Sequence, residues 1–210
     1  MQPDAGTLED TLKAAQRGEV AAFNTLIQAY QRQVFNVCYR TLGNADDAAD
    51  ATQDALLNGF RAVQGFNGPA SGLRSWLLRI AVNTCYDQLR RRQRKPSESL
   101  DALHASDGEQ EATLGDRLHD PRPGPEQHSL SAETAHHIQQ AIDQLPNEQR
   151  MTVVLCDVQG LSYDEAAQIM SVELGTVKSR LSRARAQLRV LLAEKGELPA
   201  GAARLQERSP

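Results

Sequence analysis

The sequence predicts an all-α protein made of two small helical domains joined by a flexible acidic linker. Apolar residues recur every three or four positions along most of the 210-residue chain, which is the spacing of one helix face. No run alternates apolar and polar residues, and no Asn-Gly or Asp-Gly hairpin signal separates β-branched runs. The linker is predicted because the residues that follow Pro96 are rich in Ser, Asp, Glu, Gly and Pro and cannot bury a core.

Composition limits the class of protein. Of all residues, 40% are hydrophobic but only 4% are aromatic, so the cores should be small and built from Leu, Val, Ile and Ala. Cys38, Cys85 and Cys156 are far apart and form no CxxC pair, which favours buried thiols in a reducing cytosol. His136-His137 lacks further ligands at metal spacing, and neither a metal nor a cofactor is expected. Without a signal peptide or a run of about 18 apolar residues, the chain is expected to be soluble and cytoplasmic, with no membrane insertion.

Charge is distributed unevenly along the chain. The net charge of −4 and the pI near 5.7 would by themselves argue against a nucleic-acid partner. Residues 74–95, however, carry seven Lys or Arg against one acid, and residues 175–195 carry six against one. Residues 97–133 carry nine acids against two arginines. Because binding follows the local field, two basic patches separated by an acidic segment indicate nucleic-acid binding.

The first domain, residues 1–95, should contain four helices. Their expected ranges are Leu8–Arg17, Glu19–Leu42, Ala45–Gly65 and Ser71–Arg92. The third begins with several acids, which suit the positive end of a helix dipole. The same acids, with Gln53 and Asn58, also form an outer surface that could dock on a partner helix. Composition alone does not choose between these two interpretations.

The fourth helix ends in a basic run. Arg79, Asn83, Asp87 and Arg90 lie on its outer side, followed by further Arg and Lys residues up to Lys95. Arginines bind phosphates and Asn can pair with an exposed base edge, so this face suits nucleic acid. The alternative is that these cations only complement the helix C-terminus. Trp76 falls on the inward face, which favours a core position over a platform for base stacking.

The second domain, residues 131–193, follows a linker expected at 96–130 and precedes a tail, 194–210, expected to be disordered. Helical spacing resumes at Leu130 or Ser131. Two apolar stripes follow, made of Ile138, Ala141, Ile142 and Leu145 and then of Met151, Val154, Leu155 and Val158. Pro146 forces a turn between them, and Gly160 ends the second stripe.

The segment from Leu161 to Leu192 is typical of a helix-turn-helix. Ser162 and Glu165 form an S-x-x-E capping box at the start of its first helix. The second helix has one apolar face and one basic face. The apolar face is formed by Val177, Leu181, Ala184, Leu188 and Leu191, and the basic face by Lys178, Ser182, Arg185 and Arg189, with Arg180 and Arg183 beside them. Such a helix can enter a major groove, although a solvated basic helix would show the same pattern.

Together, the two helical units resemble the extracytoplasmic-function (ECF) sigma factors of bacterial RNA polymerase, group 4 of the sigma-70 family. The resemblance covers about residues 8–192 and is carried by four segments in order. They are AFNTLIQAYQRQVFNVCYRTLGNADDAADATQDALLNGFRAVQGF, SWLLRIAVNTCYDQLRRRQR, AIDQLPNEQRMTVVLCDVQGLSYDEAAQIM and GTVKSRLSRARAQL. The N-terminal region and middle domain of housekeeping sigma factors are missing, which fits the same group.

The resemblance implies a non-enzymatic protein with no catalytic residue. Such a protein binds core RNA polymerase, directs it to promoters with −35 and −10 elements and promotes strand opening. The implied partners are the clamp helices of the largest subunit, the flap of the second-largest subunit, promoter DNA (duplex at −35, single-stranded at −10) and an anti-sigma factor. It also implies a role in a stress or envelope response, with the chain held at the inner membrane where the anti-sigma factor is membrane-bound. The acidic linker would thread toward the polymerase active-site cleft.

The resemblance also assigns roles to individual residues. The polymerase-binding set is Asp47, Asp50, Gln53 and Asp54, with Leu57 and Asn58 at its edge. At −10, Asn83 falls where the family binds a base flipped out of the non-template strand, and Arg79, Arg90 and Arg91 would hold phosphates. At −35, Thr176, Lys178, Ser179, Ser182 and Arg183 would contact base edges and adjacent phosphates, with Arg180 and Arg185 on the backbone. Some members carry a larger residue at the position of Ser182, which leaves the −35 sequence open.

Two other functions compete with this interpretation. A helix-turn-helix transcription regulator acting without polymerase would bind a palindrome as a dimer, but the basic fourth helix and the lack of a ligand-pocket composition count against it. A DNA-processing enzyme such as a recombinase would need a nucleophile flanked by arginines. Neither Tyr86 nor Ser75 has such a setting in the sequence.

Overall fold

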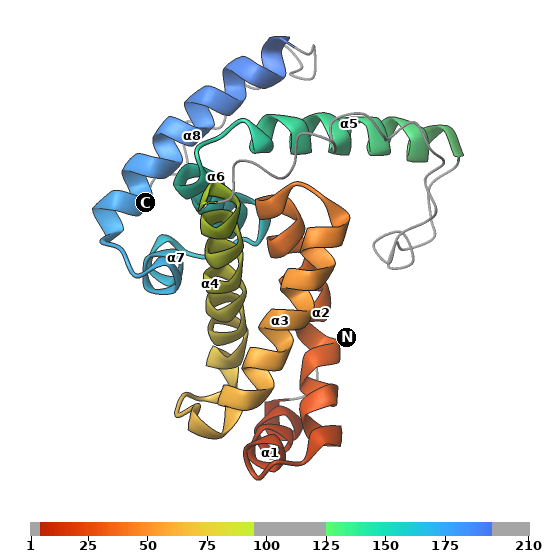
Figure 1. Ribbon diagram of the computed structural model, residues 1–210, viewed down its shortest axis with the longest axis vertical. Helices are drawn as coiled ribbons and strands as arrows, with labels where there is room; N and C mark the ends of the chain where they lie inside the picture. The colour runs from red at the N-terminus through yellow and green to blue at the C-terminus, as the bar shows by residue number, and fades with distance from the viewer. Residues whose placement is uncertain (1–4, 95–124, 195–210) are drawn as a thin grey trace.

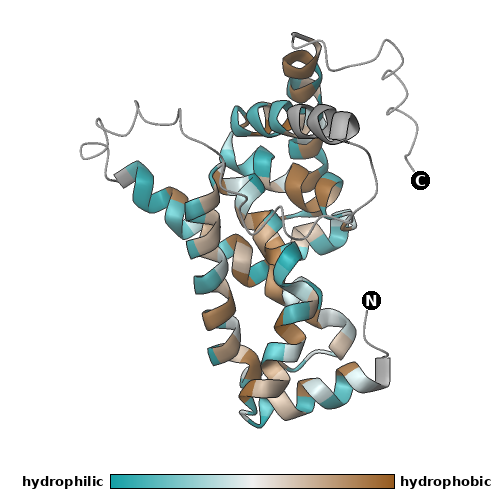
Figure 2. Cartoon of the chain, turned by 90° about the vertical axis from the view of Figure 1, so that its right-hand side faces the viewer, coloured by the Kyte–Doolittle hydropathy of each residue, from teal (hydrophilic) through white to brown (hydrophobic). Residues whose placement is uncertain are grey.

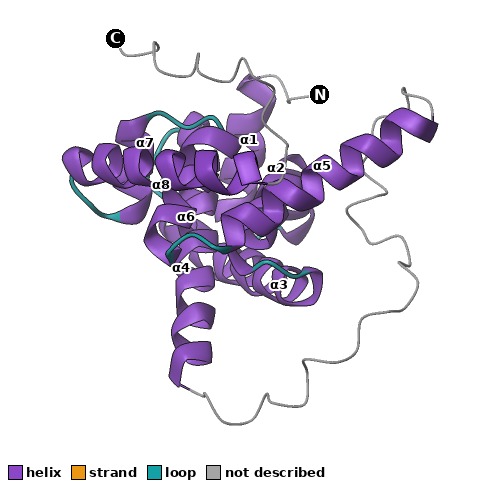
Figure 3. Ribbon diagram, turned by 90° about the horizontal axis from the view of Figure 1, so that it is seen from above, coloured by secondary structure: helices purple, strands orange, loops and turns teal. Residues whose placement is uncertain are grey.

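In the computed structural model, residues 5–94 and 125–194 are described, and all of their regular structure is helical (Figures 1 and 3). The N-terminal module, residues 5–94, contains α1 (Ala5–Gln16), α2 (Val20–Leu42), α3 (Ala45–Ala62) and α4 (Leu73–Arg94). The C-terminal module, residues 125–194, contains α5 (Pro125–Asp143), α6 (Asn147–Val153), α7 (Tyr163–Met170) and α8 (Leu174–Glu194). The all-α prediction is confirmed for these residues. Most of the expected linker and tail lies outside them.

In the N-terminal module, α2, α3 and α4 pack against one another, and α1 crosses the end of α2 (Figure 1). Phe23 and Phe60 meet edge to face at 5.2 Å between ring centroids. Gly59 lets α4 approach α3 closely, because a Cβ at this position would lie 3.2 Å from the Leu77 side chain. Trp76 packs on Phe66 at 5.1 Å at the edge of the core. Trp76 is therefore partly buried against the core, on the side that its helical spacing predicts.

The corner between α2 and α3 is defined by two caps. Gly43 ends α2 in the left-handed conformation, with φ 84°, and donates its N–H to the carbonyl of Tyr39. Asn44 then caps α3 by accepting a 2.8 Å hydrogen bond from the backbone N–H of Asp47. Each cap satisfies one terminal backbone group, and the chain turns sharply between two long helices.

In the C-terminal module, α8 packs on α5, α6 and α7. The predicted capping box is confirmed. The backbone N–H of Ser162 donates to Glu165 at 2.9 Å, and the N–H of Glu165 donates to the Ser162 hydroxyl at 3.2 Å. Ser171 ends α7 with φ 54°, which makes the tight turn of the helix-turn-helix.

At two apolar positions, the helical spacing predicts burial but the side chain is exposed. Val158 was expected on a buried stripe but is 42% exposed, because α6 continues into a π-helical turn, Val154–Val158, that shifts the register. Ile138, expected on the preceding stripe, is also exposed. Val154 and Leu155 lie in the core as expected.

The apolar faces otherwise follow the helical spacing, as the alternating brown and teal segments of Figure 2 show. Cys38, Cys85 and Cys156 are free, buried thiols, which confirms their predicted burial. No helix in residues 5–94 or 125–194 has the length and apolar character needed to cross a membrane. The two modules pack together, with α5 and α6 against α2 and with α7 against α4.

We predict that Ser162→Ala destabilises the protein by about 1 kcal/mol, because the α7 N-terminus loses its cap. Urea unfolding followed by circular dichroism measures the change. Ser182→Ala is the matched control, since Ser182 lies exposed within α8 and caps no helix. An equal loss of stability in both variants would contradict the role of Ser162 as the cap of α7.

The loss of stability caused by Ser162→Ala should also depend on pH. The backbone and hydroxyl hydrogen bonds of Ser162 lower the pKa of Glu165 below its ordinary value. A lowered folded-state pKa stabilises the fold above the unfolded-state pKa, and this contribution disappears as the pH falls through the folded-state value. The difference between Ser162→Ala and the wild type should therefore shrink through that acidic range.

Candidate nucleic-acid and partner interfaces

The second helix of the helix-turn-helix, α8, presents a polar face to solvent. Val177, Leu181 and Ala184 are buried against α6 and α7. Lys178, Ser179, Ser182 and Arg183 are exposed on other faces, and Thr176 lies half-buried in the first turn. Structure and sequence therefore agree on which side of the helix can contact a ligand.

Two arginines of this helix are bound within the module. Arg185 makes a bidentate ion pair with Asp157, with distances of 3.0 Å from Nε to Oδ2 and 2.5 Å from Nη2 to Oδ1. These hydrogen bonds raise the pKa of Arg185. Arg180 pairs with Glu148 and keeps only 17% of its side chain exposed. Asp157 and Glu148 thus reduce the local positive charge, which sequence analysis did not detect because both lie in preceding helices.

Lys178 and Arg183 provide the remaining charge of this part of α8. Neither forms an ion pair with a carboxylate in the parts of the chain that the structure describes. Arg183 makes one long contact of 3.4 Å to the Ser179 hydroxyl. These two cations are therefore available to phosphates.

The second basic element is α4. Arg79, Asn83, Arg90 and Arg91 are exposed along it, and spacings of four and seven residues place the first three on one side. Arg90 makes a 3.7 Å ion pair with Asp87. Arg79 donates a 3.3 Å hydrogen bond to the Ser171 hydroxyl in the helix-turn-helix. All four residues predicted for the −10 element are thus exposed on one helix, and three of them share a side.

Tyr86, on the same helix, is poorly suited to nucleophilic chemistry although Arg180 and Arg90 lie near enough to act on its charge. Its side chain is partly buried, and this burial raises its pKa to about 12. A phenol with a raised pKa is a poorer nucleophile at neutral pH. The burial of Tyr86 therefore counts against the recombinase alternative at this residue.

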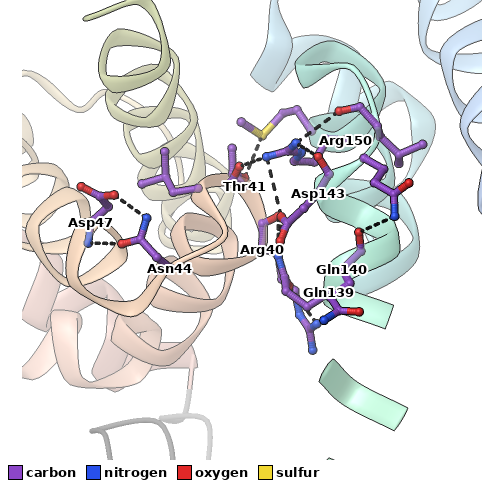
Figure 4. Close-up of polar contacts among 12 residues, drawn as sticks. Arg40, Thr41, Asn44, Asp47, Gln139, Gln140, Asp143 and Arg150 are labelled. Atoms are coloured by element: carbon purple, nitrogen blue, oxygen red, sulfur yellow. Dashed lines mark hydrogen bonds and ion pairs between the residues drawn. The ribbon is translucent and has the colours of Figure 1, made fainter. Parts of the chain in front are cut away.

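The acidic surface lies on α3. Asp50, Gln53 and Asp54 are exposed there. Asp47 is instead bound within its own module, through an ion pair with Arg92. It also makes a side-chain contact to Asn44, which Figure 4 shows. Three of the four residues predicted for polymerase binding are thus presented to a partner.

An apolar groove of about 810 Å³ lies beside this acidic surface, between α2 and α3. Val20, Phe35, Leu56, Leu57 and Phe60 contribute to its lining, and Gln53 lines it as well. Val20 and Leu57 are large exposed apolar residues. The sequence placed Leu57 only at the edge of an interface. The groove was missed because it needs two helices at a fixed distance.

Comparison with known proteins identifies this combination of modules. The family described as Sigma-70 region 2 matches residues 26–95, and Sigma-70, region 4 matches residues 136–188. The chain is 36% identical over 175 residues to the ECF RNA polymerase sigma-E factor of Escherichia coli K12, covering 83% of this chain and 88% of that protein. It is 38% identical over 173 residues to the ECF RNA polymerase sigma factor SigE of Mycolicibacterium smegmatis, covering 82% of this chain but only 62% of that longer relative.

Solved structures show the same fold. The sigma factor RpoE from Bartonella quintana, in complex with the anti-sigma factor NepR, aligns with a TM-score of 0.62 and 28% identity, covering 83% of this chain and 98% of that one. CnrH, in complex with the cytosolic domain of CnrY, aligns with a TM-score of 0.60 and 22% identity, covering 90% and 98%.

The chain therefore belongs to the sigma-70 family, as an ECF sigma factor. Members of this family are transcription initiation factors rather than enzymes. The resemblance to ECF sigma factors and the class of function predicted from the sequence are therefore confirmed. A regulator acting without polymerase is not favoured.

Proposed function

We propose that this chain binds core RNA polymerase through α3 and the groove beside it, and DNA through α4 and α8. The observation that carries the proposal is the separation of surfaces: acidic and apolar on α3, basic on α4 and α8. A partner helix that docks on α3 would bury Leu57 in the groove and place its cations near Asp50 and Asp54. Burial of apolar area supplies affinity, and the charges supply orientation and association rate.

At the −10 element, we propose that Asn83 binds a flipped base while Arg79, Arg90 and Arg91 hold the surrounding phosphates. Flipping costs a few kcal/mol, which contacts to the base and to polymerase offset. At the −35 element, Thr176, Ser179, Ser182 and Arg183 read base edges and adjacent phosphates, with Lys178 on the phosphates. Arg180 and Arg185 reach the backbone only at the expense of their ion pairs.

We further propose that an anti-sigma factor controls the protein, as NepR binds the similar sigma factor RpoE. The chain would then act in the cytoplasm within a stress or envelope response, and a membrane-bound anti-sigma factor would hold it at the inner membrane. The expected domain limits are 1–95 for core and −10 binding and 131–193 for −35 binding.

Transcription from a promoter with the purified chain and core polymerase tests the whole proposal. Promoter-dependent transcripts are expected. A chain that binds DNA alone as a dimer and yields no transcripts with polymerase would instead be a conventional helix-turn-helix regulator.

For polymerase binding, we predict that Asp54→Lys weakens the affinity for core polymerase by roughly tenfold, because a charge on the docking surface is reversed. Asp10→Lys on α1 is the control, since Asp10 is also exposed but lies away from α3. Fluorescence anisotropy of the labelled chain measures the affinity. Equal affinities for the two variants would argue against α3 as the docking surface.

For DNA recognition, we predict that Asn83→Ala and Arg183→Ala fail at different steps. Asn83→Ala should lose opening of the −10 region while keeping −35 protection, because only a base contact in the opened strand is removed. Arg183→Ala should weaken −35 protection by about 1–3 kcal/mol. Permanganate reactivity measures opening of the −10 region, and footprinting measures −35 protection. If both variants lost both signals, the proposed assignment of Asn83 to −10 and Arg183 to −35 would be refuted.

For the role of the ion pairs, we predict that Lys178→Ala and Arg185→Ala differ in salt dependence. Each phosphate contact contributes about 0.9 to the slope of log K against log salt. Lys178→Ala should lower the slope by about that amount, and Arg185→Ala by clearly less, because Asp157 already neutralises Arg185. Affinity for a −35 duplex at several salt concentrations measures both slopes.

A further inference from the structure

The two modules meet at the C-terminal end of α2, where side chains of the C-terminal module complete a helix of the N-terminal module. Arg150, in α6, is only 9% exposed. One of its nitrogens donates a 2.8 Å hydrogen bond to the carbonyl of Thr41, in the last turn of α2. The last carbonyls of a helix lack partners within it, and a cation there is favourable. Arg150 therefore acts as a cap for α2 supplied from the other module.

Arg150 is held in position by its own module. It donates to the carbonyls of Asp143 and Leu145 and lies 3.8 Å from the Asp143 carboxylate (Figure 4). Its guanidinium thus bridges the end of α5 and the end of α2. Separating the modules would leave the Thr41 carbonyl and part of the guanidinium in need of water.

A second polar contact lies beside the first. Arg40 of α2 donates a 3.0 Å hydrogen bond to the side-chain oxygen of Gln139 in α5. The amide nitrogen of Gln139 reaches the Arg40 carbonyl at 3.5 Å and donates to Asp143 at 2.9 Å. Gln139 is 4% exposed, so these bonds are shielded from water.

Gly43 shows how closely the modules approach. A Cβ at this position would lie 2.9 Å from Oδ1 of Asp143 and 3.1 Å from its Cγ. Asp143 cannot move away freely, because Gln139 and Arg150 both hold it. Gly43 therefore has two functions. It ends α2 in the left-handed conformation, and it leaves room for the other module.

The contact extends to the DNA-binding helices. Arg74 of α4 donates a 2.7 Å hydrogen bond to the carbonyl of Gln159, just before the helix-turn-helix. Arg79, proposed to hold a −10 phosphate, donates to Ser171 of the helix-turn-helix. The helix α7 packs both on α4 and on α8.

This arrangement cannot engage both promoter elements at once. The names of the −35 and −10 elements place them about 25 base pairs apart, which at about 3.4 Å per base pair is roughly 85 Å of duplex. Here only α7 separates the −35 helix, α8, from the −10 helix, α4. The modules must therefore part before the promoter is bound.

We propose that the packed arrangement is a self-inhibited resting state, closed by a latch at the end of α2. The latch comprises Arg40, Thr41 and Gly43 on one side and Gln139, Asp143 and Arg150 on the other. The proposal rests on the proposed function, because it is promoter binding that requires the modules to separate. The polymerase complex that engages both promoter elements contains only the open form, so the apparent affinity that governs its assembly is reduced by the fraction of chain that is open.

Gly43→Asn tests the latch selectively. Asn tolerates the left-handed conformation at a helix end, so the α2 cap is kept, while its side chain collides with Asp143. Gly18→Asn and Gly160→Asn are matched controls. Both glycines have positive φ, and the nearest heavy atom to an added Cβ is 3.8 Å away at Gly18 and beyond 4 Å at Gly160.

Small-angle X-ray scattering of the full chain measures opening without polymerase. The radius of gyration should increase for Gly43→Asn and remain that of the wild type for both controls. Arg40→Glu, which breaks the bond to Gln139 and places a carboxylate near Asp143, should also open the chain if Gly43→Asn folds poorly. A wild type that is already extended in solution, or variants that all remain compact, would overturn the latch.

Transcription over a range of polymerase concentrations measures the consequence. Opened variants should reach half-maximal transcription at a polymerase concentration at least about threefold lower than the wild type, with the same plateau. Opening without this gain would refute self-inhibition. Absence of transcripts from every variant at saturating polymerase would refute the proposed function itself, while the scattering result would still decide whether the latch exists.

Discussion

The unpaired carbonyl groups at the C-terminal end of α2 are the constraint on which the arrangement of this molecule depends. Gly43 satisfies one by turning its own N–H back to Tyr39. Arg150 satisfies another from the C-terminal module, at Thr41. Asn44 begins the next helix at once, so the same corner fixes both the α2–α3 angle and the position of the second module.

The charged groups of this protein interact over short distances. The net charge is acidic although two of the helices, α4 and α8, are basic. Within those helices, internal acids reduce the charge further. Glu148 and Asp157 bind Arg180 and Arg185, and Asp47 is bound by Arg92. On α8 and α3, the charges presented to partners are therefore fewer than the sequence suggests, and they include Lys178 and Arg183 on α8 and Asp50 and Asp54 on α3. Recognition then depends on a small number of well-placed groups.

The proposed polymerase-binding surface and the proposed −10 surface lie on different helices of the same module, α3 and α4. The groove between α2 and α3 adds apolar area to an acidic surface, which gives a docking helix both affinity and orientation. On α4, Asn83 remains exposed even with the modules packed together, while Arg79 contacts the turn of the helix-turn-helix. Packing of the two modules therefore places the proposed −10 surface of α4 against the helix-turn-helix that contains α8.

Local patterns in the sequence by themselves determined the helices, the capping box at Ser162, the buried cysteines and the exposed faces of α4 and α8, because helical spacing and caps act within a few residues. Val158 is an exception, since a π-helical turn changes the helical spacing at this position. Only the tertiary structure decided which charges are bound internally, where the groove lies and how the modules meet. Arg185 and Asp157 are 28 residues apart, and Arg150 and Thr41 are 109 apart. Such pairs depend on how the helices pack in space, which periodicity along one helix does not specify.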